Sequence, residues 1–256
     1  MTGIPAGPIF DFHVRLGPGP SARAELLTAM DASGIRRAAV CAGGVVDLDR
    51  LSRQLVEGGQ VESDADNERV RAACADSGGR LVPVYFANPH STVDSYARHA
   101  AGFRALELSP AVHGVGFDDP RTAALVRVAA GVGHCVYTVP VGRPGSRTGD
   151  LVGLARAFPG VTFVLGHCGF TGIDTHALNQ IAGQPNILAE TSGCFTVVAR
   201  LALRRLGPDR VLFGTEHPLQ SPAVELAKFA ALAPDQDTWH RVAWHNAHRL
   251  LREVAP

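Results

Sequence analysis

Residues 9–20, "IFDFHVRLGPGP", decide how the rest of the chain is interpreted. An apolar run carries Asp11, His13 and Arg15 to its end and then stops at glycine and proline, which interrupt regular structure. Alternate residues of a strand point to the same side, so we expect His13 and Arg15 to project together from one strand end. Two histidines at this spacing would supply half of a metal site. The arginine in the second place therefore needs a chemical explanation.

Seven further runs of this kind follow, and together they predict eight strands. They are short, mostly apolar and nearly continuous, which is typical of parallel strands buried on both faces. They lie at residues 35–44, 80–89, 103–110, 133–142, 161–169, 185–193 and 210–218.

Helical patterns lie between these runs, at residues 21–34, 64–79, 118–133, 148–160, 193–207 and 235–254. Alternating strands and helices imply right-handed crossovers and a parallel sheet. Eight such units in 256 residues favour a closed barrel over an open sheet, because barrels of this type need roughly 250 residues. The sequence therefore predicts one α/β domain over residues 1–256, a (β/α)8 TIM barrel. The loops after the strands look short and plain in composition.

The overall composition excludes several classes of protein. Lys plus Arg equals Asp plus Glu, at 24 each, and no basic run or acidic tail occurs, so no contact with nucleic acid or a membrane surface is expected. The N-terminal residues lack a signal-peptide pattern, and no apolar run approaches the roughly 20 residues that span a bilayer. Five scattered cysteines without a C-x-x-C pair indicate a reduced, cytoplasmic protein.

Polar side chains recur where the predicted strands end, which is the face on which TIM barrels build their active sites. We expect these side chains to converge, because buried polar groups without partners are costly. They are His13, Glu107, Thr138, His167, Glu190 and Glu216.

Six segments, taken in order, resemble the amidohydrolase-related family, the second amidohydrolase group of the metal-dependent hydrolase superfamily. The segments are IFDFHVR (9–15), GFRALELSPAVHGVGFDDPRTAALVRVAA (102–130), FVLGHCGF (163–170), NILAETSG (186–193), DRVLFGTEHP (209–218) and NAHRLL (246–251). The resemblance implies a barrel with one divalent metal, commonly zinc. It also implies hydrolysis of amides or lactones, or removal of carboxylate groups from aromatic and related acids.

The resemblance further implies a set of metal ligands, and this chain departs from that set three times. Relatives use two strand-one histidines, a strand-five histidine and a strand-eight aspartate, while a strand-six histidine assists the substrate or the water. Here Arg15 replaces the second histidine, Thr138 lies at or near the strand-five position, and Glu216 replaces the aspartate. Only His13 and His167 are unchanged.

The departures leave two interpretations of the site open. His13, His167 and Glu216 could supply three ligands to a divalent metal such as zinc. Arg15, however, is a permanent cation without a lone pair, and a nearby metal would repel it. The metal-free interpretation is slightly preferred. In it Arg15 holds a carboxylate or an oxyanion, Glu216 is the general base, and His13 or His167 relays protons.

Four further residues are candidates for substrate binding, each with a structural alternative. Glu107 stands where relatives often carry a strand-four lysine or arginine, and it could instead form a buried pair with Arg15. His113 and His217 could line the pocket or be packed loop histidines. Thr138 is a candidate because it lies at the end of the fifth predicted strand.

The sequence therefore predicts an amidohydrolase-like hydrolase that acts on a lactone, ester or amide bond of a small, carboxylate-bearing molecule. A non-oxidative decarboxylase, or another lyase or cyclase, is the first alternative. A barrel without catalysis, serving as a binding or scaffold subunit, is the second. The expected partner is a small, anionic molecule, and a homo-oligomer is left open.

Overall fold

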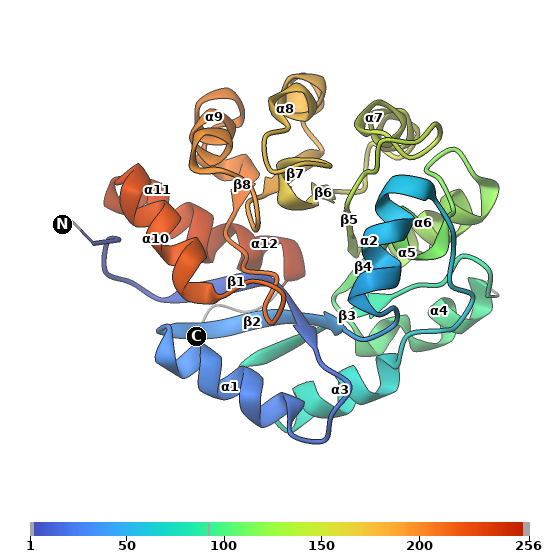
Figure 1. The fold of residues 1–256 in the computed structure, drawn as a ribbon, viewed down its shortest axis with the longest axis horizontal. Helices are drawn as coiled ribbons and strands as arrows, with labels where there is room; N and C mark the ends of the chain where they lie inside the picture. Colours follow the sequence, from blue (N-terminus) through green and yellow to red (C-terminus); the bar gives the residue numbers. More distant parts are fainter. Residues whose placement is uncertain (1–2, 92, 253–256) are drawn as a thin grey trace.

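Eight parallel strands form a nearly closed barrel with helices around it, as predicted (Figure 1). The computed structural model describes residues 3–91 and 93–252. Each strand pairs with its neighbours in sequence, in the order β1 to β8. The strands are β1 (Ile9–Leu16), β2 (Ile35–Ala42), β3 (Leu81–Phe86), β4 (Ala105–Leu108), β5 (Cys135–Thr138), β6 (Phe163–Leu165), β7 (Ile187–Glu190) and β8 (Val211–Leu212).

The helices include all six predicted segments and several that the sequence patterns missed. They are α1 (Ala22–Ala32), α2 (Leu48–Glu57), α3 (Asn67–Ala75), α4 (Val93–His99), α5 (Pro110–His113), α6 (Pro120–Val132), α7 (Thr148–Ala157), α8 (Thr175–Ala182), α9 (Thr196–Leu206), α10 (Pro222–Leu232), α11 (Gln236–His240) and α12 (Asn246–Leu251). Within residues 3–91 and 93–252, no helix combines the length and apolar character needed to cross a membrane.

The expectation of uniformly short loops was wrong for the connection after β2. Residues 43–66 link β2 to α3 and include the additional helix α2, which contacts α5 (Figure 1). Asp47 begins α2 by accepting a hydrogen bond from the backbone N–H of Arg50, a standard helix cap. This helix therefore lies at the carboxyl ends of the strands, where it can form part of a site.

The barrel closes between β1 and the segment that follows β8. The backbone N–H of Glu216 donates to the carbonyl oxygen of His13 (2.8 Å), and the N–H of Arg15 donates to the carbonyl oxygen of His217 (2.7 Å). These bonds continue the strand pairing beyond β8, and they place the first and last candidate site segments side by side.

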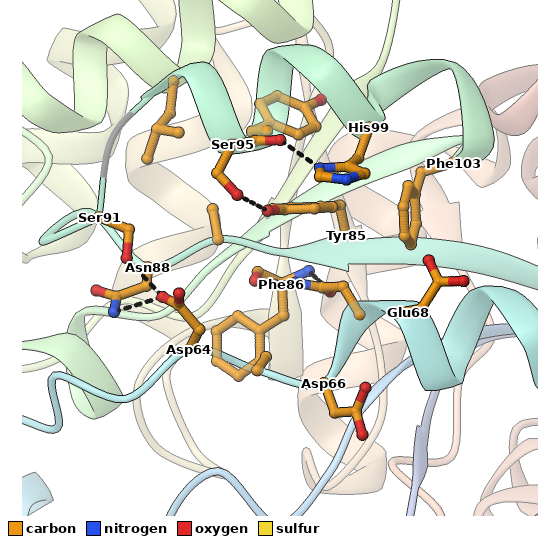
Figure 2. A pocket seen from close by; sticks show the side chains of 15 residues that line it. Asp64, Asp66, Glu68, Tyr85, Phe86, Asn88, Ser91, Ser95, His99 and Phe103 are labelled. Carbon is orange, nitrogen blue, oxygen red and sulfur yellow. Dashed lines mark hydrogen bonds between the residues drawn. The ribbon is translucent and has the colours of Figure 1, made fainter.

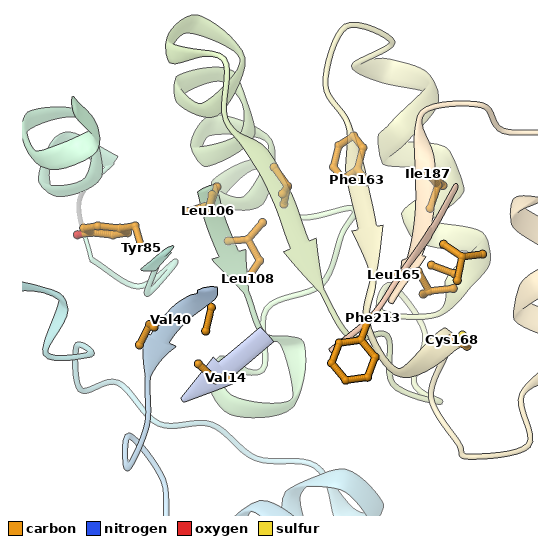
Figure 3. Packing of buried hydrophobic residues seen from close by; sticks show 14 of the residues in the cluster. Val14, Val40, Tyr85, Leu106, Leu108, Phe163, Leu165, Cys168, Ile187 and Phe213 are labelled. Carbon is orange, nitrogen blue, oxygen red and sulfur yellow. The ribbon is translucent and has the colours of Figure 1, made fainter. Parts of the chain in front are cut away.

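A change of register in β1 sets which side chains face the barrel interior. Phe10 and Phe12 belong to the apolar cluster inside the barrel, and the register with β2 shifts between Asp11 and Val14. Val14 packs in the other cluster, between strands and helices, together with residues such as Leu106 (Figure 3). Beyond the shift, His13 and Arg15 face inward together, as their spacing predicts.

Candidate active site

Four charged side chains meet at the carboxyl end of the barrel, and we call them the charge cluster: His13, Arg15, Glu107 and Glu216. Arg15 Nε donates to Glu216 Oε1 (2.7 Å), and Arg15 Nη2 donates to Glu107 Oε1 (2.8 Å). His13 lies between the same two carboxylates. Its Nε2 is 3.1 Å from Glu107 Oε2, and its Nδ1 forms an ion pair with Glu216 Oε2. Each cation therefore bridges both anions.

The proton affinities of these groups follow from that arrangement. Burial favours the neutral form of Glu107, but Arg15 and His13 outweigh it and lower the pKa of Glu107 to about 2. Burial also disfavours a charged His13, but Glu216 and Glu107 outweigh it and raise the pKa of His13 to about 10. In the same way the two cations hold the pKa of Glu216 well below its usual range, against the effect of burial. At neutral pH the charge cluster holds two positive and two negative charges.

Aromatic and acidic neighbours fix His13 in place. The ring of Tyr137 stacks on the imidazole with 4.0 Å between centroids and 15° between planes. Asp11 is fully buried and accepts hydrogen bonds from the backbone N–H groups of His13 (3.2 Å) and Thr215 (2.9 Å), and from the Thr215 hydroxyl. Burial raises the pKa of Asp11 to about 7, in spite of these bonds. Asp11 therefore ties β1 to the segment after β8.

His167 lies beside the charge cluster, next to Glu216. Its Nδ1 is 2.9 Å from the hydroxyl and 3.0 Å from the carbonyl oxygen of Ser192, while its Nε2 is 3.7 Å from Glu216 Oε2. A carbonyl oxygen can only accept, so Nδ1 carries a hydrogen. In the neutral ring Nε2 therefore presents its lone pair on the side of Glu216.

Glu190 positions the segment that carries His167. This fully buried carboxylate accepts hydrogen bonds from the Tyr137 hydroxyl (3.0 Å), the Ser192 hydroxyl (2.9 Å) and the backbone N–H of His167 (3.3 Å). These bonds give Glu190 a structural role at the end of β7. His167 (φ 57°) and Glu216 (φ 58°) both have left-handed backbone conformations, which are strained for side chains of this kind and cluster at functional sites.

A cavity of about 390 Å³ borders this group of residues. Its polar side chains are Arg15, Asp47, Ser109, His167 and Glu216. Its apolar side chains come from several loops and from α2, and the larger ones are Val45, Val46, Leu48, Leu51, Leu55, Phe86, Val112, Val139, Phe170 and Leu219. Most of the side chains that line the cavity are therefore apolar, with five polar ones among them.

A second hollow, of about 200 Å³, lies between α3, β3 and α4 (Figure 2). It is acidic, and its three carboxylates already have partners. Asp64 Oδ1 accepts from Asn88 Nδ2 (2.9 Å) and from the Ser91 hydroxyl (2.6 Å). Asp66 accepts from the backbone N–H of Arg69 (3.0 Å), and Glu68 accepts from Arg71 Nε (2.9 Å). His13, Arg15 and the other members of the charge cluster do not line it. The cavity beside the charge cluster is therefore the candidate active site.

Four of the candidate substrate-binding residues are not among the side chains that line the cavity beside the charge cluster: Glu107, His113, Thr138 and His217. Thr138 is buried and donates to the carbonyl oxygen of Leu108 (2.7 Å). His113 is buried with Nδ1 2.8 Å from the carbonyl oxygen of Val61. His217 is half-buried beside Glu216, and burial lowers its pKa. Glu107 pairs with Arg15, which is the structural alternative considered for it. The sequence patterns did not predict that residues of α2 line the cavity.

The chain belongs to the amidohydrolase family, whose model matches residues 10–252. No curated protein sequence is detectably similar to it. Among solved structures, an uncharacterised TIM-barrel protein from Bordetella bronchiseptica is 20% identical, with a TM-score of 0.75 over 96% of this chain and 99% of that one. These matches confirm the predicted family and fold.

Two further structural relatives are named for different reactions. A 5-carboxyvanillate decarboxylase from Novosphingobium aromaticivorans, complexed with manganese and a nitrobenzoic acid, is 16% identical, with a TM-score of 0.71 over 95% of this chain and 96% of that one. A proposed 2-pyrone-4,6-dicarboxylic acid hydrolase from Pseudomonas putida is 15% identical, with a TM-score of 0.71 over 97% and 98%. Family membership therefore implies a hydrolase or a decarboxylase.

The residues of this chain do not fit the metal that the family implies. Among the described residues, no group of three or more His, Cys, Asp or Glu side chains is arranged to hold a metal ion. The guanidinium of Arg15 instead contacts both nearby carboxylates, and both ring nitrogens of His13 face those same carboxylates. A divalent cation here would add two charges to a balanced cluster and lie next to a fixed cation.

Proposed function

We propose that this protein hydrolyses a lactone, ester or amide bond of a small molecule, and that it does so without a metal. The observation that carries the proposal is the position of His167. Its Nε2 lies at the cavity, 3.7 Å from Glu216 Oε2, while its Nδ1 is 3.0 Å from the carbonyl oxygen of Ser192. A neutral imidazole oriented in this way is suited to general-base catalysis.

The proposed reaction assigns His167 rather than Glu216 as the base. Glu216 binds protons weakly because Arg15 and His13 stabilise its anion. His167 Nε2 accepts a proton from water as the water oxygen attacks the carbonyl carbon. The bond from that carbon to the leaving oxygen or nitrogen then breaks, and the proton passes from His167 to the leaving group. Proton transfer of this kind contributes about 10²–10⁴-fold to rate.

Arg15 is the candidate donor to the oxyanion that forms during attack. Its Nε and Nη2 groups are bound to Glu216 and Glu107, whereas the contact of Nη1 with the Ala42 carbonyl oxygen is long, at 3.5 Å. The side chain is 18% exposed and lines the cavity, so Nη1 can donate to a bound carbonyl oxygen. Such preorganised donors stabilise developing charge without reorganisation. The two glutamates hold the guanidinium in place.

The proposal is tested with a panel of lactones, aryl esters and anilides, with product acid followed in a pH-stat and carbon dioxide measured in parallel. Hydrolysis by metal-depleted protein is expected, and His167→Asn should lower kcat at least 100-fold. The exposed His176 on α8 provides the matched control, and His176→Asn should keep the activity of the original protein. Release of carbon dioxide from an aromatic acid, without hydrolysis of any panel member, would replace this proposal with the decarboxylase alternative.

A further inference from the structure

Resting on the proposed function, we propose that the substrate is an uncharged molecule whose non-reacting part is an alkyl or aromatic group. That group packs against α2, with the scissile carbonyl directed toward His167. This differs from the carboxylate-bearing substrate that the sequence alone suggested, because the charges and the walls of the cavity favour a neutral, apolar group.

The charges at the cavity do not favour an anion. The two cations of the charge cluster are balanced by Glu107 and Glu216, each of which contacts both of them. Asp47, at the start of α2, adds a further negative charge to the lining. A substrate carboxylate would therefore give up its hydration at a site without net positive charge, close to two protein carboxylates.

The walls of the cavity favour an apolar group. Leu51 and Leu55 of α2 both line it, and they lie on one face of the helix because residues four apart are neighbours there. The buried amide of Gln54 fixes that face by donating to the carbonyl oxygens of Ala111 (2.7 Å) and Val112 (3.2 Å). The leucines are only half-buried, so a bound apolar group would remove their remaining surface from water.

Exposed side chains of the cavity lining are also apolar. Phe170, after β6, is 36% exposed, and Leu219, after β8, is 49% exposed, and both line the cavity. Apolar side chains thus extend from the reacting groups to the rim. A pocket that is mostly apolar with a few convergent polar groups is typical of small-molecule sites, in which the polar groups set orientation.

Binding to the His167→Asn protein tests the substrate class apart from catalysis. Isothermal titration calorimetry compares dihydrocoumarin, a neutral aryl lactone, with a dihydrocoumarin that carries one ring carboxylate. The neutral lactone should bind at least tenfold more tightly. Equal or tighter binding of the carboxylate, or no binding of either, would overturn the inference. If the neutral lactone binds but the original protein does not hydrolyse it, the proposed function fails while the substrate class stands.

Variants of α2 test where the apolar group lies. Leu51→Asn should weaken dihydrocoumarin binding at least tenfold, and Leu55→Asn gives a second measurement should the first variant fold poorly. Val56 is on the same helix, is 83% exposed and does not line the cavity, so Val56→Asn should bind as the parent does. Equal affinities of the folded Leu51→Asn and Val56→Asn proteins would exclude α2 as the binding wall.

Discussion

Replacing Glu107 with glutamine removes one negative charge from the charge cluster and keeps the shape of the side chain. In the folded protein the cations Arg15 and His13 lower the pKa of Glu107 from 4.5 to about 2, against the opposing effect of burial. This depression corresponds to roughly 3 kcal/mol of folding stability at neutral pH. Glu107→Gln should therefore lower the free energy of unfolding by about that amount, in line with the cost of breaking a buried ion pair.

The pH dependence of this loss has a definite sign. Because the folded-state pKa is lowered, the stabilisation is complete above pH 4.5 and disappears as the pH falls toward 2. Urea unfolding followed by circular dichroism, at several pH values, should show the original protein and the variant converging in acid. Glu68→Gln is the control, since Glu68 forms only an exposed pair with Arg71 and should change stability little. A Glu107→Gln protein as stable as its parent at pH 7, or a difference independent of pH, would refute the reasoning.

Three further predictions concern the supports of the site and its metal content. A side chain at Gly214 would collide with the buried carboxylate of Glu190, so Gly214→Ala should lower both stability and kcat. Gly153→Ala is the control, because Gly153 lies in open space within α7, and this change should raise the thermal midpoint slightly. The pKa of His13 is raised from 6.5 to about 10, so the contribution of His13 to stability is complete below pH 6.5 and is lost as the pH rises through 10. Urea unfolding at several alkaline pH values should show this decline in stability, and His13→Phe should abolish the decline. Elemental analysis should find less than stoichiometric metal after incubation with zinc and gel filtration, and one retained zinc per chain would contradict the metal-free proposal.

The sequence was sufficient for the fold and for the meeting of the central residues. Nearly continuous apolar strands and their number predict a parallel barrel, and in such a barrel all strand carboxyl ends lie on one face. That geometry alone brings His13, His167 and Glu216 together, although they are far apart in the chain. It also made a buried pair of Glu107 with Arg15 one of the two alternatives considered for Glu107, and the structure contains that ion pair.

Other features depended on backbone details that a one-dimensional pattern does not carry. Thr138 follows Tyr137, which belongs to the apolar cluster inside the barrel, and successive residues of a strand point to opposite faces. Thr138 therefore bonds to the neighbouring strand rather than lining the cavity. The orientation of His167 could not be predicted from the sequence either, because it depends on a left-handed backbone conformation and on the contact with Ser192. The cytoplasmic location and the homo-oligomer stay predictions.

The helix α2 was missed because its apolar residues are few and lie among charged ones. Leu48, Leu51 and Leu55 are separated by arginine, aspartate and glutamine side chains, so the segment does not stand out as an apolar run. Its apolar face becomes meaningful only when the helix is placed beside the cavity. The sequence patterns therefore did not indicate that part of the cavity wall comes from the connection after β2.

That connection has a consequence for protein engineering. Residues 43–66 connect β2 to α3, and none of the four residues of the charge cluster belongs to this connection. Exchanging the connection for one of different size or polarity would change the cavity wall while the charge cluster stays in place. Libraries confined to residues 43–66 are therefore a suitable starting point for altering which molecules bind in this barrel.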